Sequence, residues 1–260
     1  FTQTITIDEN YMFKVTQGVT NNTNSSITLF PYARIVRTGT PKTLGFFVLH
    51  EGPIGVFNET LKELSYDDLS DEGKISEKST GGWIGITDKY WLVAIVPDQT
   101  QEFNASFRHQ NNSQDQYQTD VLHSGIEINP GSSSEVTNHL FAGAKEVDTL
   151  EYYNQQLNIS RFDLTIDWGW LFFLTKPIFL AINFLYEWTG NFGVAIIIFT
   201  IFVRLLFYPL ANKSFRSFGA MRKVQPEVVR IRETYKDDRE RMSKEMMELY
   251  KREKVNPLSG

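Results

Sequence analysis

The chain contains no cysteine among its 260 residues, so neither a disulfide framework nor a thiolate metal site can form. Histidine is scarce as well. No glycine-rich phosphate loop or nucleophile elbow is present, and metal-ligand spacing is absent from the four histidines, His50, His109, His123 and His139. We interpret these histidines as ordinary surface or loop residues. We therefore expect no metal, no cofactor and no enzymatic activity.

Long apolar runs are almost absent. The hydrophobic content of 41% is ordinary for a globular protein, so any membrane character must be local. One run stands out, because residues 188–212 contain a single charged residue, Arg204. About 20 helical residues at ~1.5 Å each cross the ~30 Å hydrocarbon core of a bilayer. The sequence therefore predicts one transmembrane helix over residues 190–212.

The charges are distributed unevenly around this run. Residues 1–212 carry 13 Lys and Arg against 23 Asp and Glu, whereas residues 213–260 carry 13 against 8. Basic residues next to a span favour the cytoplasmic side, so we expect the segment after Lys213 in the cytoplasm and residues 1–158 outside it. The chain begins at Phe1 without an initiator Met or a signal peptide, so we expect it to be a fragment.

The first part of the chain has the pattern of a β-sandwich. Branched or aromatic residues alternate with polar ones, and Gly, Asn, Asp and Ser separate the runs. Strands are predicted over residues 3–9, 11–16, 26–37, 44–49, 83–86, 90–96, 102–109 and 116–123. The acidic segment 67–79 is predicted to be an exposed loop, and residues 148–157 a short helix. The expected extracytoplasmic domain is all-β and covers residues 1–158.

Residues 159–189 are predicted to be a linker and an amphipathic helix that lies in the membrane interface. Residues 168–186 are apolar and aromatic, but Lys176 and Pro177 near their middle disfavour a membrane span. Three tryptophans are expected to anchor this helix, namely Trp168, Trp170 and Trp188. The alternative is a second transmembrane helix that turns tightly through residues 187–191. That alternative would place the β domain in the cytoplasm.

Arg204 is the strongest candidate functional residue. It lies nine positions before Lys213, which is about 13 Å along a helix. A charge at that depth is unfavourable unless it faces water or a partner, so we interpret Arg204 as part of a functional site. The alternative is an arginine that snorkels to the cytoplasmic headgroups. An extended side chain reaches about 6–7 Å, so snorkelling would also require local thinning of the bilayer.

Residues 213–260 are predicted to form a cytoplasmic helical hairpin. Segments 215–235 and 239–254 are dense in charge, with apolar residues at steps of three and four. Lys236-Asp237-Asp238 offers a turn and an N-cap between them. Pro226 is expected to start or kink the first helix, and Asn256-Pro257 to end the second. Eight acidic residues interleave with the basic ones, so we expect no recognition of nucleic acid.

Several motifs, in this order and spacing, resemble the YidC family of bacterial membrane protein insertases. The match is strong over about the last hundred residues and looser over the β domain. The motifs are Gly81-Gly82-Trp83, Asp167-Trp168-Gly169-Trp170-Leu171, Val203-Arg204-Leu205-Leu206-Phe207-Tyr208-Pro209-Leu210, Met221-Arg222-Lys223-Val224-Gln225-Pro226, Met246-Met247-Glu248-Leu249-Tyr250-Lys251 and Lys254-Val255-Asn256-Pro257-Leu258.

The resemblance implies a β-supersandwich in the periplasm, a protein of the bacterial inner membrane and a mechanism of insertion. Five core transmembrane helices of the family enclose a polar groove, in which a buried arginine matched by Arg204 receives the hydrophilic part of a substrate. One helix cannot enclose a groove, so this chain alone is not expected to insert proteins. The implied partners are nascent membrane proteins, the lipid bilayer, the Sec translocon, and the ribosome or signal recognition particle machinery. The hairpin residues expected to make such contacts are Met221, Gln225, Pro226, Met246, Met247 and Tyr250.

Two other functions remain open at the level of sequence. The chain could be a membrane-anchored periplasmic carbohydrate-binding or mutarotase-like module, which requires a histidine and a carboxylate in one cleft. It could also be a structural membrane-anchored protein, for which Arg204 would be dispensable.

Overall fold

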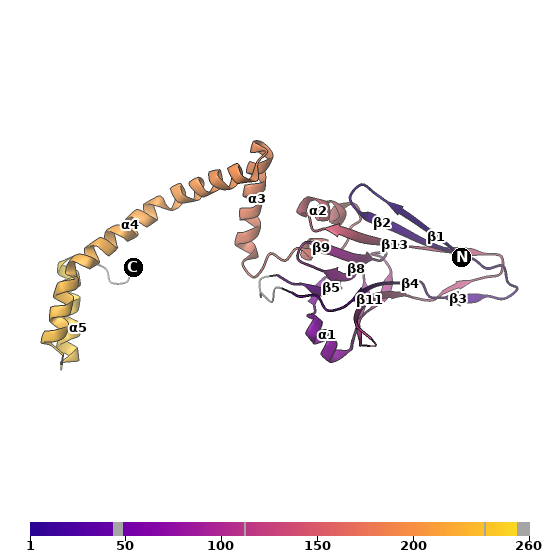
Figure 1. The fold of residues 1–260 in the computed structure, drawn as a ribbon, viewed down its shortest axis with the longest axis horizontal. Helices are drawn as coiled ribbons and strands as arrows, with labels where there is room; N and C mark the ends of the chain where they lie inside the picture. Colours follow the sequence, from indigo (N-terminus) through magenta and orange to yellow (C-terminus); the bar gives the residue numbers. More distant parts are fainter. Residues whose placement is uncertain (44–48, 112, 237, 254–260) are drawn as a thin grey trace. The chain divides into compact units, whose positions relative to one another are not determined.

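The computed structural model describes residues 1–43, 49–111, 113–236 and 238–253. The chain divides into two compact units, Phe1–Leu171 and Phe172–Gly260, which we call the β unit and the helical unit (Figure 1). The strand predicted over 44–49 falls almost entirely outside the described residues.

In the β unit, the residues that the structure describes form two large antiparallel sheets and a small one. The larger sheet has the strand order β1-β2-β13-β9-β8-β5-β6. Its strands are β1 (Thr2–Ile7), β2 (Met12–Thr20), β13 (Ser133–Ala144), β9 (Trp91–Val96), β8 (Gly82–Thr87), β5 (Gly52–Phe57) and β6 (Thr60–Glu63). The second sheet has the order β4-β11-β10-β7, with bounds Tyr32–Thr38, Asp115–His123, Glu102–Asn111 and Lys74–Thr80. Strands β12 (Ile126–Ile128) and β3 (Ile27–Leu29) pair with each other.

The two large sheets enclose a hydrophobic core. Phe103 and Phe107 of β10 are fully buried, and they share this core with Ile84 and Ile95 of the opposite sheet. The alternation along β10 places every second side chain in this core, as the sequence pattern predicted. The prediction of an antiparallel β-sandwich is confirmed.

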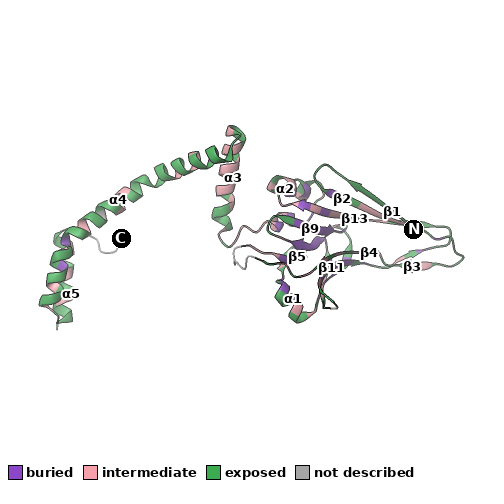
Figure 2. Cartoon of the chain, viewed as in Figure 1, coloured by how far each residue is buried: buried purple, intermediate pink, exposed green. Residues whose placement is uncertain are grey.

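A second core lies on the other face of the seven-stranded sheet. Helix α2 (Val147–Gln156) and the short helix η1 (Phe162–Thr165) supply Tyr153 and Phe162, and the rings of Trp83 and Phe162 meet edge to face at 5.6 Å. Figure 2 shows many of the buried residues in the strands of this unit. The helix predicted over 148–157 is confirmed. Residues 159–166, which we expected in a linker, instead complete this core.

The predicted loop over 67–79 is wrong. Helix α1 (Tyr66–Glu72) and strand β7 occupy this segment. Ser65 and Asp68 form a reciprocal capping box, and Gly73 ends the helix at φ 71°. The acidic residues in the first turn favour the helix N-terminus, which explains why they do not mark a loop.

Other differences from the predicted strands follow from burial and proline. Strand β5 is buried along its whole length, so it lacks the alternation by which half-buried strands are recognised. Strands β6, β12 and β13 were also missed. The run predicted over 26–37 divides into β3 and β4 around Pro31, which cannot donate a ladder hydrogen bond.

The described residues of the helical unit form three long helices. They are α3 (Phe172–Thr189), α4 (Phe192–Thr234) and α5 (Arg239–Arg252). The helices that we expected separately over 190–212 and 215–235 are one continuous helix, α4, which contains Pro209 and Pro226 in its interior. The predicted stop at Asn256-Pro257 lies outside the described residues.

Candidate functional site in the helical unit

Helix α4 is the one helix in the described part of the chain that is long and apolar enough to cross a membrane. Only 6% of the most apolar 18-residue stretch of α4 is buried inside the protein, whereas the core helix of a soluble protein would be mostly buried. The exposed apolar side chains call for an apolar environment outside the described residues, and α4 is the candidate for the predicted transmembrane segment.

A tight turn joins α3 to α4. Gly190 adopts φ 66°, and the side chain of Asn191 caps α4 by accepting hydrogen bonds from the backbone N–H of Gly193 (2.8 Å) and Val194 (3.2 Å). The rings of Tyr186 and Phe192 stack across the turn with centroids 4.0 Å apart. The alternative of a second transmembrane helix also predicted a tight turn here, but α3 is not apolar enough to qualify as a membrane span. An interfacial position of α3 stays a prediction.

Arg204 lies within the apolar part of α4. It is 12 residues after Phe192, which corresponds to about 18 Å along the helix. Its side chain is exposed, and it has no ion pair or side-chain hydrogen bond to any residue that the structure describes. The polar groove expected around Arg204 is thus not formed by the described residues of this chain. The guanidinium has five N–H donors that are available to a partner.

Two further polar side chains share the helix face of Arg204. Thr200 and Tyr208 are four residues before and after it, and residues four apart lie on one face of a helix. The hydroxyl of Thr200 donates to the backbone carbonyl of Ile196 at 2.7 Å, which satisfies it within the apolar segment. Neither residue was predicted from the sequence, although the four-residue spacing from Arg204 is visible there.

The end of α4 packs against α5 as an antiparallel hairpin. Val224 and Val228 of α4 and Leu249 of α5 are buried between the helices. A salt bridge of 2.6 Å joins Glu227 to Arg252 across the pair. Asp238 caps α5 by accepting from the backbone N–H of Arg241 at 3.0 Å. The hairpin interior is narrow, as the apolar stripes predicted.

The six hairpin residues expected to contact partners fall into two groups. Met221, Met246 and Tyr250 are partly buried against the small core, so they hold the hairpin together. Gln225, Pro226 and Met247 are exposed and leave their side chains available to a partner.

The three predicted anchor tryptophans also differ from one another. Trp170 and Trp188 are 85% and 77% exposed, whereas Trp168 is half-buried and engaged within the protein. Trp170 and Trp188 therefore have the exposure that an interfacial anchor needs.

A cleft of about 270 Å³ in the β unit brings a histidine and a carboxylate together, as the carbohydrate-binding alternative requires. Asp8 and His139 both line it, together with Lys14 and Tyr153. Burial, followed by the positive charge of Lys14, lowers the pKa of His139. The carboxylate of Asp8, however, already accepts hydrogen bonds from Tyr153 and from two backbone N–H groups. The Asp8 carboxylate therefore serves mainly to stabilise the fold, and few of its lone pairs are left to accept a hydrogen bond from a ligand.

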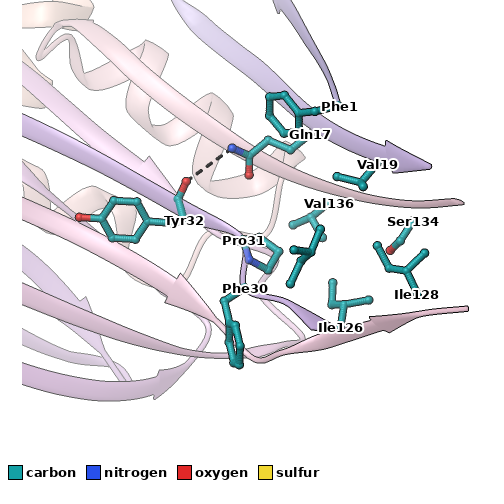
Figure 3. A pocket seen from close by; sticks show the side chains of 11 residues that line it. Phe1, Gln17, Val19, Phe30, Pro31, Tyr32, Ile126, Ile128, Ser134 and Val136 are labelled. Atoms are coloured by element: carbon teal, nitrogen blue, oxygen red, sulfur yellow. Dashed lines mark hydrogen bonds between the residues drawn. The ribbon is translucent and has the colours of Figure 1, made fainter. Parts of the chain in front are cut away.

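A larger cleft of about 340 Å³ is apolar (Figure 3). The side chain of Gln17 donates to the backbone carbonyl of Tyr32 at 3.5 Å across it. Its lining residues include no carboxylate, histidine or lysine; they are Phe1, Gln17, Val19, Leu29, Phe30, Pro31, Tyr32, Ile126, Ile128, Ser134 and Val136. This cleft lacks the pair of groups that a mutarotase needs.

Comparison with known proteins covers both units. A family model described as the YidC periplasmic domain matches residues 1–181, and one described as 60Kd inner membrane protein matches residues 184–260. Proteins named membrane protein insertase YidC from Brucella suis biovar 1 and Beijerinckia indica subsp. indica are 45% and 44% identical to the chain over 263 residues. They match 100% of this chain, which spans only 43% and 44% of their lengths.

One similar solved structure is described as an active YidC insertase with the first transmembrane domain resolved. It is 17% identical to the chain, covers 81% of this chain and 58% of its own, and superposes with a TM-score of 0.30.

Proposed function

Since this chain belongs to the YidC family, we propose that it is the part of a membrane protein insertase that supplies one groove helix, the cytoplasmic hairpin and much of the periplasmic domain. The proposal rests mainly on one observation. Arg204 lies within the apolar part of α4 and has no partner among the described residues. A cation at that depth costs ~2.5–3.5 kcal/mol on insertion scales unless water or a carboxylate compensates it.

In the proposed mechanism, further helices of the longer protein complete a water-lined groove around Arg204. A substrate places the acidic part of its translocated segment in this groove while its apolar segment moves into lipid. The fixed positive charge offsets the desolvation of each carboxylate, and no covalent bond is made or broken. Thr200 and Tyr208 would line the same side of the groove, since they share the face of Arg204.

We propose that the β unit lies in the periplasm and the hairpin in the cytoplasm of a bacterium. The sign change of the charge on the two sides of the span supports this orientation. Gln225, Pro226 and Met247 would then be accessible to a nascent chain, the Sec translocon, or the ribosome and signal recognition particle machinery. Single cysteines test the orientation, since the chain has none of its own.

In intact spheroplasts, an impermeant maleimide should label a cysteine at Ser70 of α1 and leave one at Ser243 of α5 unlabelled. After permeabilisation both should react. Labelling of Ser243→Cys before permeabilisation would contradict the proposed orientation.

The function is tested on Arg204 within the full-length protein in an insertase-depleted strain. Arg204→Ala and Arg204→Glu should impair insertion of a substrate with several carboxylates in its translocated tail, on the order of tenfold, because a carboxylate at membrane depth is costly without a cation. Arg204→Lys should be partly tolerated, since it keeps the charge but loses the planar fork. Arg216→Ala, beyond the span, is the matched control.

The diagnostic quantity is the dependence of the defect on tail charge. The defect of Arg204→Ala should grow as carboxylates are added to the tail. If this variant inserts every tail as well as the wild type at equal protein levels, Arg204 is a snorkelling anchor and the proposal fails.

A further inference from the structure

The turn between β8 and β9 exposes two large aromatic side chains. Tyr90 and Trp91 are 64% and 60% exposed, and the ammonium of Lys89 lies 5.0 Å from the centre of the Tyr90 ring. The turn is well defined, because the backbone N–H of Asp88 donates to the carbonyl of Trp91 at 2.8 Å. We call residues 89–91 the aromatic tip. A lysine beside exposed Tyr and Trp is the combination found at membrane interfaces.

The aromatic tip lies where the chain leaves the β unit. Asp167, in the exit segment, accepts a hydrogen bond from the backbone N–H of His50 at 3.1 Å. Two residues later, Gly52 at the start of β5 pairs with Thr87 at the end of β8, immediately before the tip. Figure 1 shows the exit segment close to the strands β5, β8 and β9.

Lys145, which follows β13, makes hydrogen bonds to the tip and to the end of β8. Its backbone N–H donates to the carbonyl of Tyr90 at 2.8 Å, and its ammonium donates to the hydroxyl of Thr87 at 2.9 Å. Burial lowers the pKa of the Lys145 ammonium, and the negative charge of Asp167 opposes this shift. The tip and the exit segment are therefore neighbours on one end of the β unit.

The exit segment leads directly to exposed aromatic residues. Trp170 is 85% exposed, and Phe172 and Phe173 in the first turn of α3 are 62% and 65% exposed. Phe172 lies five positions after Asp167, so even a fully extended chain spans about 17 Å between them. With α3 in the membrane interface, as predicted above, the end of the β unit that carries the tip lies close to the bilayer surface.

We propose that the aromatic tip inserts into the interfacial region of the phospholipid bilayer and anchors the β unit directly to lipid. The rings of Tyr90 and Trp91 sit at the level of the headgroups, and the ammonium of Lys89 reaches the phosphates. The neighbouring carboxylate of Asp88 is paired with Arg37 at 2.6 Å, which reduces its repulsion from lipid phosphate. This contact is independent of the insertion mechanism and of Arg204.

The proposal is tested with the full chain reconstituted into phosphatidylcholine vesicles that contain lipids with a nitroxide near the headgroup. An environment-sensitive fluorophore is attached to Tyr90→Cys or to Glu127→Cys in separate proteins. Glu127 is an exposed residue of β12, which pairs with β3 at the end of the β unit away from the exit segment (Figure 1). The fluorophore at position 90 should be blue-shifted and quenched, and the one at position 127 should be neither. Equal quenching at both positions overturns the proposal.

A second variant isolates the contribution of the rings. With the fluorophore on Lys89→Cys, the double substitution Tyr90→Ser and Trp91→Ser should reduce quenching about threefold, because the interfacial preference of the aromatic rings is lost. Circular dichroism checks that the β unit stays folded. Unchanged quenching in the double variant contradicts insertion of the rings. Quenching that appears only when anionic lipid is added contradicts it as well, because the contact would then be electrostatic.

Discussion

The hydroxyl of Tyr153 lies 2.7 Å and 2.6 Å from the two carboxylate oxygens of Asp8. These residues are 145 positions apart, and their contact joins helix α2 to the turn between β1 and β2. The same carboxylate also accepts hydrogen bonds from the backbone N–H groups of Asn10 and Met12. Asp8 therefore fixes the turn and the helix at the same time.

Tyr153→Phe should destabilise the β unit by about 1 kcal/mol, because it removes a hydrogen bond to a charged group that is partly exposed to water. Urea unfolding followed by circular dichroism measures the difference. Tyr152→Phe is the control, since its hydroxyl makes no hydrogen bond to a described residue. Equal effects of the two substitutions would show that the contact with Asp8 does not stabilise the fold.

The contribution of Asp8 should disappear in acid. Burial alone would raise its pKa, but the hydrogen bonds from Tyr153, Met12 and Asn10 outweigh burial and lower the pKa below 3.8. A carboxyl whose pKa is lowered in the folded state stabilises the fold above its unfolded pKa, and this stabilisation is lost as the pH falls through the folded value. The difference in unfolding free energy between wild type and Tyr153→Phe should thus be full at about pH 6 and smaller at about pH 3. A difference independent of pH would contradict this assignment.

Residues beyond 158 should stabilise the β unit. Phe162 is completely buried against Trp83 and Phe141, so Phe162→Ala should cost about 3–5 kcal/mol. A chain that ends at Asn158 should unfold at a lower urea concentration than one that ends at Leu171. Identical unfolding curves for the two chains would place the domain boundary before η1 after all.

Gly82→Ala should be far more destabilising than Gly131→Ala. Both glycines have positive φ, at 103° and 73°, so both substitutions strain the backbone by about 1–2 kcal/mol. A Cβ on Gly82 would also lie 2.0 Å from the carbonyl oxygen of Val56, whereas a Cβ on Gly131 would meet nothing within 4 Å. Thermal unfolding of the two variants separates steric overlap from backbone strain. Similar melting temperatures would argue against the close approach of β8 to β5.

Leu249→Ser should open the hairpin without affecting the β unit. Leu249 is one of three buried residues between α4 and α5, and its loss removes about 2–5 kcal/mol from a very small core. Hydrogen exchange should become faster throughout α5 and stay unchanged in β8 to β11. The exposed neighbour Met247→Ser is the control. Protection of α5 that survives in Leu249→Ser would show that other contacts hold the hairpin closed.

The sequence predicted those parts of the fold where burial is one-sided. Strands β10 and β11 alternate because one face meets the core, and α2 shows helical spacing because one face covers a sheet. Strand β5 is buried on both faces by the two cores, so its sequence lacks the alternation of apolar and polar residues from which a strand is predicted. The loop predicted in place of α1 has a different cause, since the acidic capping residues conceal two buried positions, Tyr66 and Leu69.

The candidate site was predictable to the extent that it depends on one charge in an apolar run. Arg204 was identified because a lone cation within a span has an energetic cost, and the family matches confirm the resemblance on which its role was based. The sequence could not predict which hairpin residues are partly buried and which are exposed. Met246 and Met247 are adjacent in the sequence, and only the packing against Val224 and Val228 distinguishes the one that is partly buried from the one that is exposed.

The continuity of α4 joins the apolar segment to the hairpin through two prolines. Its 43 residues extend over about 65 Å, so the segment with Arg204 and the segment that packs against α5 belong to one helix. Pro209 and Pro226 both lie between Arg204 and Val228, and a proline in a helix interior removes a backbone hydrogen bond and favours a kink. We expect a tilt of the hairpin to be absorbed as bending at these prolines before it reaches Arg204.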